Sequence, residues 1–81
     1  MTKEEIKKRV IEQILEVAPD VQESEISDNE NIQRSLEIDS FDFLKILVAL
    51  SEKVGVEVPE SDYSKVSTVE KMVEYLANRQ K

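Results

Sequence analysis

The stretch DSFDFLKILVALSEKVG, residues 39–55, decides the fold of this chain. Its apolar side chains recur at the spacing i, i+3, i+4, i+7 and i+11, which gathers them on one face of an α-helix: Phe43, Ile46, Leu47, Leu50 and Val54. Asp39 stands where a helix cap is expected, and Gly55 stands just past the end, where chains often leave a helix in the left-handed conformation. The pattern therefore predicts a helix from Ser40 to about Val54 with one face in the core.

Two more amphipathic helices are expected, one on each side. Thr2 and Glu5 form a T-x-x-E capping box before a first helix, which should end at Ala18-Pro19 because proline lacks a backbone N–H. Its apolar stripe consists of Ile6, Val10, Ile14 and Val17, widened by Ile11 and Leu15. The last helix should open with a second capping box, Ser67-x-x-Glu70, and bury Val69, Met72, Val73 and Leu76.

Between the first two helices, Asp20 to Ile38 is polar, with apolar anchors too sparse for a second long helix: Val21, Ile26, Ile32, Leu36 and Ile38. We expect a long ordered loop there, and a short helical turn from Ser61 to Lys65. Long loops in small domains tend to be functional, which directs attention to the point where this one ends, at Asp39-Ser40. The predicted fold is all-α: a small four-helix bundle in a single domain over residues 1–81, with three main helices, one short helix and a long loop after the first helix.

The composition excludes several classes of function. The 81 residues contain no histidine and no cysteine, which removes the commonest general base, the thiol nucleophile and the usual zinc ligands, so intrinsic catalysis is not expected. The sequence also lacks the Gly-x-Ser-x-Gly elbow of a serine hydrolase, which excludes that class of enzyme. A calcium loop over residues 28–33 would place Gln33 where the sharp turn needs glycine, so no metal site is predicted. No apolar stretch could cross a bilayer, and we expect a cytoplasmic protein or a mature organellar one.

The net charge of −7 is concentrated in one region. From Asp20 to Asp42 there are eight acidic residues and a single basic one, Arg34. Such a field disfavours nucleic acid and could steer a basic partner enzyme, although a loop kept soluble by its charge would look the same.

A second apolar stripe, formed by Phe41, Leu44 and Val48, runs beside the core face of the same helix. We expect Phe41 and Val48 to point away from the core, next to Ser40. This surface is either a partner-docking patch or the wide apolar arc of a short helix in a small bundle.

Ser40 is the candidate site residue. A serine at a helix start is usually a cap, but here Asp39 can cap, which leaves the Ser40 hydroxyl free to project. A phosphodiester on Ser40 would lie at the positive end of the helix dipole, near N–H groups without intrahelical partners. The position is suited to carrying a phosphate and not to cleaving a substrate.

Three segments together resemble the acyl carrier protein family: residues 36–42 around Asp39-Ser40-Phe41, Gly55-Val56-Glu57-Val58-Pro59, and Ser67-Thr68-Val69. The resemblance implies that a phosphopantetheinyl transferase attaches phosphopantetheine from coenzyme A to Ser40. Acyl groups would then ride as thioesters on the terminal thiol of that arm, and partner enzymes of fatty acid, lipid or polyketide-type biosynthesis would do the chemistry. It also implies a monomer with a partner-binding surface on the second main helix, made of Asp39, Phe41, Asp42, Val48 and Glu52.

Several positions depart from the family pattern. Glu37 stands where glycine is usual and Phe41 where leucine is usual, while Lys45, Ser51 and Lys53 dilute an ordinarily acidic helix face. These differences favour a specialised carrier over the housekeeping carrier of fatty acid synthesis. Phe43 stands where smaller residues are common near the mouth of the acyl pocket, so it either reshapes that space or packs in the core.

Two alternatives to an acyl carrier are a peptidyl carrier and an adaptor that carries no prosthetic group. Peptidyl carriers usually have glycines before the serine, whereas this chain has Ile38-Asp39, which favours the acyl type. A function of another class is a non-modified acidic helical adaptor that binds a basic partner through Phe41 and Val48.

Overall fold

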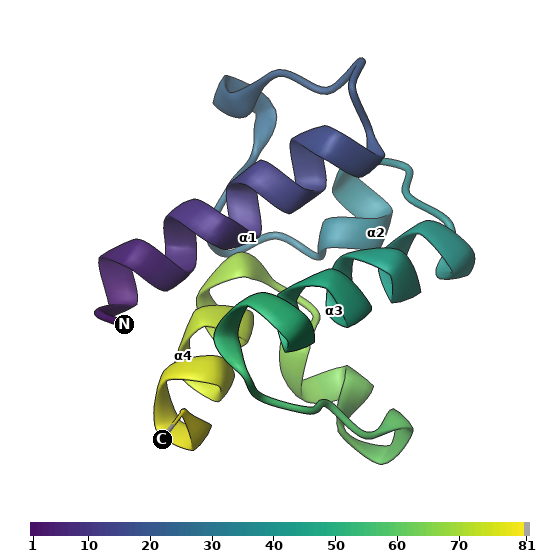
Figure 1. The fold of residues 1–81 in the computed structure, drawn as a ribbon. Coiled ribbons are helices and arrows are strands. Elements are labelled where there is room, and N and C mark those ends of the chain that lie inside the picture. The colour runs from purple at the N-terminus through teal and green to yellow at the C-terminus, as the bar shows by residue number, and fades with distance from the viewer. Residues whose placement is uncertain (81) are drawn as a thin grey trace.

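The computed structural model describes residues 1–80 and shows the predicted bundle (Figure 1). Its elements are α1 (Lys3–Val17), the 3-10 helix η1 (Glu23–Glu25), α2 (Ile32–Ser35), α3 (Ser40–Val54), the 3-10 helix η2 (Glu60–Val66) and α4 (Val69–Arg79). Over these 80 residues there is no β-strand, only an isolated bridge between Asn31 and Thr68. The all-α prediction, with three main helices and a shorter one before the last, is confirmed.

The start of α1 is capped as its sequence predicts. The Thr2 hydroxyl oxygen accepts the backbone N–H of Glu5 at 3.1 Å, and the Glu5 carboxylate accepts the backbone N–H of Thr2 at 3.2 Å. This reciprocal pair satisfies N–H groups that have no intrahelical partner. The helix ends at Val17, directly before Ala18-Pro19.

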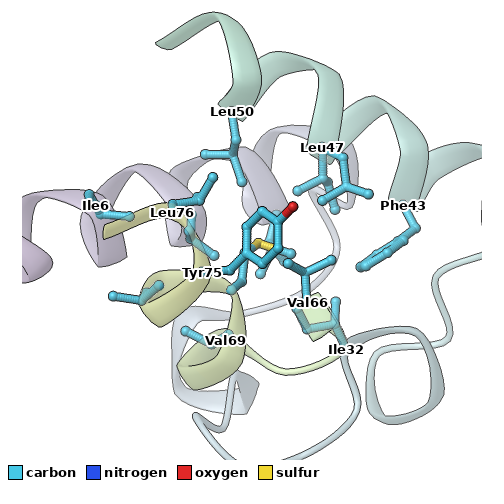
Figure 2. Close-up of a cluster of buried hydrophobic side chains, with 14 of the residues drawn as sticks. Ile6, Ile32, Phe43, Leu47, Leu50, Val66, Val69, Tyr75 and Leu76 are labelled. Atoms are coloured by element: carbon cyan, nitrogen blue, oxygen red, sulfur yellow. The ribbon is translucent and has the colours of Figure 1, made fainter. Parts of the chain in front are cut away.

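One apolar core lies between the three long helices (Figure 2). Helix α1 packs against both α3 and α4, and α4 also packs against η2. Four of the five predicted core residues of α3 are buried, and Val54 packs partly buried at the edge. The long helices contribute Ile6, Val10, Ile14, Phe43, Ile46, Leu47, Leu50, Val69, Met72, Val73, Tyr75 and Leu76 to this core.

The long loop is ordered, and it contains two short helical turns, η1 and α2, that the sequence analysis did not predict. A turn of four residues is too short to show a helical period, so α2 leaves no pattern to detect. Asn31 caps α2 by accepting the Arg34 N–H at 2.9 Å. Two buried anchors, Ile32 and Ile38, hold the segment on the core as expected.

The predicted capping box at Ser67 and Glu70 is wrong by one residue. Thr68 is the N-cap of α4, and its hydroxyl accepts the Lys71 N–H at 3.0 Å. The Ser67 carbonyl accepts the Ile32 N–H at 2.9 Å, and the Glu70 N–H donates to the Asp28 carbonyl at 3.0 Å. The Glu70 N–H, which a Ser67 cap would have bonded, is therefore bonded by the long loop instead.

The two ends of the described chain meet. The terminal amino group of Met1 donates to the Gln80 side-chain oxygen at 2.8 Å, and the Gln80 side-chain amide donates back to the Met1 carbonyl. In Figure 1 both ends lie on the opposite side of the bundle from the start of α3.

Candidate functional site

Ser40 is the first residue of α3 and is exposed. Asp39 is the N-cap, with φ −77° and ψ 174°, and its Oδ1 accepts the Asp42 N–H at 2.8 Å. Within residues 1–80, no hydrogen bond engages the Ser40 hydroxyl. The prediction that Asp39 and not Ser40 caps the helix is confirmed, and the Ser40 hydroxyl is left exposed without a capping hydrogen bond.

The approach to Ser40 depends on a left-handed residue. Glu37 has φ 54°, and it is the single non-glycine residue of the described chain with a positive φ. The turn closes when the Ile38 N–H donates to the Gln33 carbonyl at 3.0 Å. It buries Ile38 while Asp39 and Ser40 emerge at the surface. Position 37 departs from the family pattern where the backbone conformation favours glycine.

An open groove of about 570 Å³ lies beside Ser40. Its walls come from the α2 region, from the start of α3 shortly after it, and from η2, which is distant from both in the sequence. The lining residues are Asn31, Gln33, Ser40, Phe41, Phe43, Leu44, Tyr63, Ser64 and Ser67. The sequence analysis identified Ser40, Phe41, Phe43 and Leu44 as residues of interest here. It did not assign the other polar lining residues to this site, because nothing in their local sequence marks them: Asn31, Gln33, Tyr63, Ser64 and Ser67.

The η2 wall of the groove is tied to α4. The Tyr75 hydroxyl donates to Asp62 Oδ2 at 2.6 Å, and the Arg79 guanidinium lies over the Tyr75 ring at 3.8 Å from its centre. This hydrogen bond lowers the pKa of Asp62 and raises the pKa of Tyr75. Tyr63 and Ser64, which line the groove, directly follow Asp62, so the Asp62–Tyr75 bond positions that wall.

The predicted partner-binding residues all lie on α3 or at its cap. Phe41 is 78% exposed and Val48 is 52% exposed, as expected, while Asp39 and Glu52 are exposed and Asp42 is half-buried. Leu44, at 41% exposure, continues the same apolar stripe between Phe41 and Val48. All five candidates therefore lie along the helix that Ser40 begins, with Asp39, Phe41 and Asp42 close to Ser40 and Val48 and Glu52 further along it.

Part of the local negative charge is neutralised by neighbouring lysines. Lys7 of α1 pairs with Asp28 at 2.9 Å, and Lys45 lies 3.6 Å from Asp42. The remaining acids of the loop and the cap are exposed: Asp20, Glu23, Glu25, Glu30, Glu37 and Asp39. The field around Ser40 thus remains acidic, although Lys45 weakens it on α3.

The described chain has neither a metal-binding cluster nor a membrane-spanning helix. Over residues 1–80, no three carboxylates gather closely enough to hold a metal ion. No helix within that range combines the length and apolar character needed to cross a bilayer.

Comparisons with known proteins point to one family. Residues 8–76 match the family described as the phosphopantetheine attachment site. An acyl carrier protein of Lactobacillus johnsonii is 34% identical over 99% of this chain and 99% of its own length. One of Campylobacter lari is 36% identical over 96% and 95% of the two chains, and one of Rubrobacter xylanophilus is 31% identical over 91% and 95%.

The fold leads to the same group of proteins. The solution structure of a protein assigned as an acyl carrier protein from Anaplasma phagocytophilum superposes with a TM-score of 0.86 and 26% identity. That match covers 100% of this chain and 94% of the other. Sequence and fold agree along nearly the whole chain.

Proposed function

Because this chain belongs to the acyl carrier protein family and carries acyl groups on phosphopantetheine, we propose that Ser40 is the residue that bears this group. The observation that supports Ser40 is its exposed position at the start of α3 with Asp39 as the cap. Of the three long helices in the described chain, α3 alone begins with a serine. We also propose that residues 1–81 form one carrier domain.

The surroundings of Ser40 fit a phosphodiester. The backbone N–H groups in the first turn of α3 lie next to its side chain, and such groups favour an anion. During attachment, the Ser40 oxygen would form a bond to phosphorus while the bond to the adenosine bisphosphate half of coenzyme A breaks. The hydroxyl proton would pass to the transferase. When bound, the group supplies a thiol that holds acyl groups as thioesters.

Acyl carrier proteins are carriers and not catalysts. The role of Ser40 is therefore that of a substrate for the transferase, and thioester chemistry belongs to partner enzymes. This removes the apparent conflict between a chain without histidine or cysteine and a role in metabolism.

Intact mass measurement tests the assignment of Ser40. Incubation with coenzyme A and a promiscuous phosphopantetheinyl transferase should add one phosphopantetheine to the wild type and none to Ser40→Ala. Ser64→Ala is the matched control, because Ser64 lines the same groove and is also exposed. It should be loaded as the wild type is. A Ser40→Ala protein that still gains the mass would reject the proposal.

The partner surface is proposed to be Asp39, Phe41, Asp42, Val48 and Glu52. Phe41 and Val48 expose apolar area beside these acids, so the best-fitting partner enzyme has basic residues around an apolar depression. Glu52→Gln should lower the rate of association with a partner enzyme, and added salt should reduce the difference from wild type. Glu74→Gln is the control, because Glu74 is on α4 and pairs with Lys3. Equal effects of the two changes would contradict this surface.

The exposed Lys45 and Lys53 support a specialised carrier, because they place positive charge on the helix that partner enzymes would meet. Fatty acid synthase enzymes should bind this chain less well than a carrier with a fully acidic helix. Equal turnover of both carriers would reject the specialisation. The monomeric state and the cytoplasmic location stay predictions, and sedimentation of the holo form tests the first.

A further inference from the structure

The groove beside Ser40 has a closed floor, formed by Phe43. This side chain lines the groove, yet it is only 5% exposed and belongs to the apolar core. Figure 2 shows its ring at one end of the core, beyond Leu47 and Val66. Phe43 therefore lies at the boundary between the groove and the interior.

The core behind Phe43 offers no free path. Ile32, Ile46 and Val66 are each 1% exposed or less, and Leu47 is 3% exposed. Because protein interiors are close-packed, an aliphatic chain could enter only by displacing the Phe43 ring or separating the elements around it. The ring thus acts as a barrier and not as a guide into the bundle.

The wall opposite α3 is also held in place. Tyr63 and Ser64 line it, and the neighbouring Asp62 accepts the Tyr75 hydroxyl at 2.6 Å. Moving η2 outward to admit a chain would break this hydrogen bond and separate η2 from α4, against which it packs. In this structure, the Phe43 ring and the η2 wall together separate the groove from the apolar core.

The groove suits a small and partly polar guest. Its volume of about 570 Å³ is in the range that holds one drug-sized molecule, so a folded-back phosphopantetheine arm with a short acyl group would fill it. Besides Ser40, five of its lining residues have hydroxyl or amide side chains that could hydrogen-bond a polar acyl group: Asn31, Gln33, Tyr63, Ser64 and Ser67.

Resting on the proposed role of Ser40, we propose that the cargo of this carrier is a short or polar acyl group that lies in the surface groove. In this proposal Phe43 is the specificity-determining residue, because it closes the interior to longer aliphatic chains.

The test loads the full chain with butyryl, hydroxybutyryl and octanoyl groups through a promiscuous transferase, and compares amide NMR shifts with those of the holo form. In the wild type, the two short groups should shift the signals of Asn31, Gln33 and Ser64, with a larger shift of the side-chain amides for hydroxybutyryl. The octanoyl group should leave the core amides of Ile46 and Val66 unshifted. Its thioester should react with hydroxylamine no more slowly than the butyryl thioester.

The variant Phe43→Val should open the interior. Its octanoyl form should then show shifted Ile46 and Val66 amides, slower reaction with hydroxylamine and a higher melting temperature than its own holo form. The control Phe41→Val removes the same ring from the exposed rim of the groove and should leave the core amides unshifted. If Phe43→Val does not fold, the wild-type measurements alone decide.

Three outcomes would overturn the inference. The first is a set of shifted core amides in octanoyl wild type, and the second is the absence of groove shifts with either short group. The third is a folded Phe43→Val protein whose core is unaffected by octanoyl. All three leave Ser40 as the loaded residue, whereas a failure to gain mass at all would instead overturn the proposed function.

Discussion

The Asp39 carboxylate accepts the backbone N–H of Asp42 at 2.8 Å, and so it caps the helix that Ser40 begins. Asp39→Ala should destabilise the protein by about 1 kcal/mol, the usual cost of losing such a cap. Asp39→Asn keeps an acceptor oxygen at the same place and should remain close to wild type. Urea denaturation of the three proteins measures the difference, and an alanine variant as stable as wild type would contradict the capping role.

The left-handed Glu37 is a source of backbone strain before the site. Glu37→Gly should raise stability by about 0.5 to 1 kcal/mol, because glycine tolerates φ 54° but loses more chain entropy on folding. The control is Glu57→Gly, at an exposed residue outside the helices without positive φ, which should lower stability instead. Thermal unfolding by circular dichroism compares them, and the same sign of change in both variants would refute the strain.

Gly55 ends α3 with φ 77° and ψ 27°. A Cβ at this position would meet nothing within 4 Å, so the cost of Gly55→Ala should come from the backbone alone. We expect a loss of about 1 kcal/mol, the penalty of a left-handed L-residue. Gly55→Asn should lose less, because asparagine adopts this conformation more readily. Equal urea midpoints for glycine and alanine would show that the end of α3 relaxes to another conformation.

Tyr75→Phe removes the hydrogen bond to Asp62 but keeps the ring under Arg79. The bond lowers the pKa of Asp62 below its ordinary value of 3.8, so its stabilisation is present above that pH and is lost as the pH falls through the folded-state pKa. Wild type should therefore be more stable than Tyr75→Phe at neutral pH, and the difference should shrink in acid. Urea midpoints at neutral and acidic pH check this, and a difference independent of pH would mean that Asp62 does not contribute through its charge.

The same bond has an alkaline limit. It raises the pKa of Tyr75 above 10.0, and a raised pKa stabilises the fold below the unfolded value and ceases to do so as the pH rises through the folded value. The advantage of wild type over Tyr75→Phe should therefore also disappear at strongly alkaline pH.

The long helices were predictable because their signals are local. The caps Thr2, Asp39 and Gly55 and the apolar periods next to them are all within single segments of sequence. For the same reason, the exposure of Phe41 and Val48 follows from their place on the α3 wheel.

The features that the sequence did not reveal depend on distant partners. The cap of α4 is Thr68 and not the predicted Ser67, because the backbone groups of Ser67 and Glu70 form hydrogen bonds with the long loop. Tyr75 can be buried in the core because its hydroxyl donates a hydrogen bond to Asp62 on η2. No pattern in the sequence around Tyr75 predicts this contact. The polar side of the groove likewise exists only once the α2 region, with Asn31 and Gln33, and η2, with Ser64, have folded together.

Met1 and Gln80 contact each other, and the two ends of the described chain lie on the side of the bundle away from the start of α3 (Figure 1). Fusion of another domain, or immobilisation on a solid support, at either end would therefore leave Ser40 and the start of α3 accessible to solvent. A carrier attached through either end could therefore still present the group on Ser40 to several enzymes in turn.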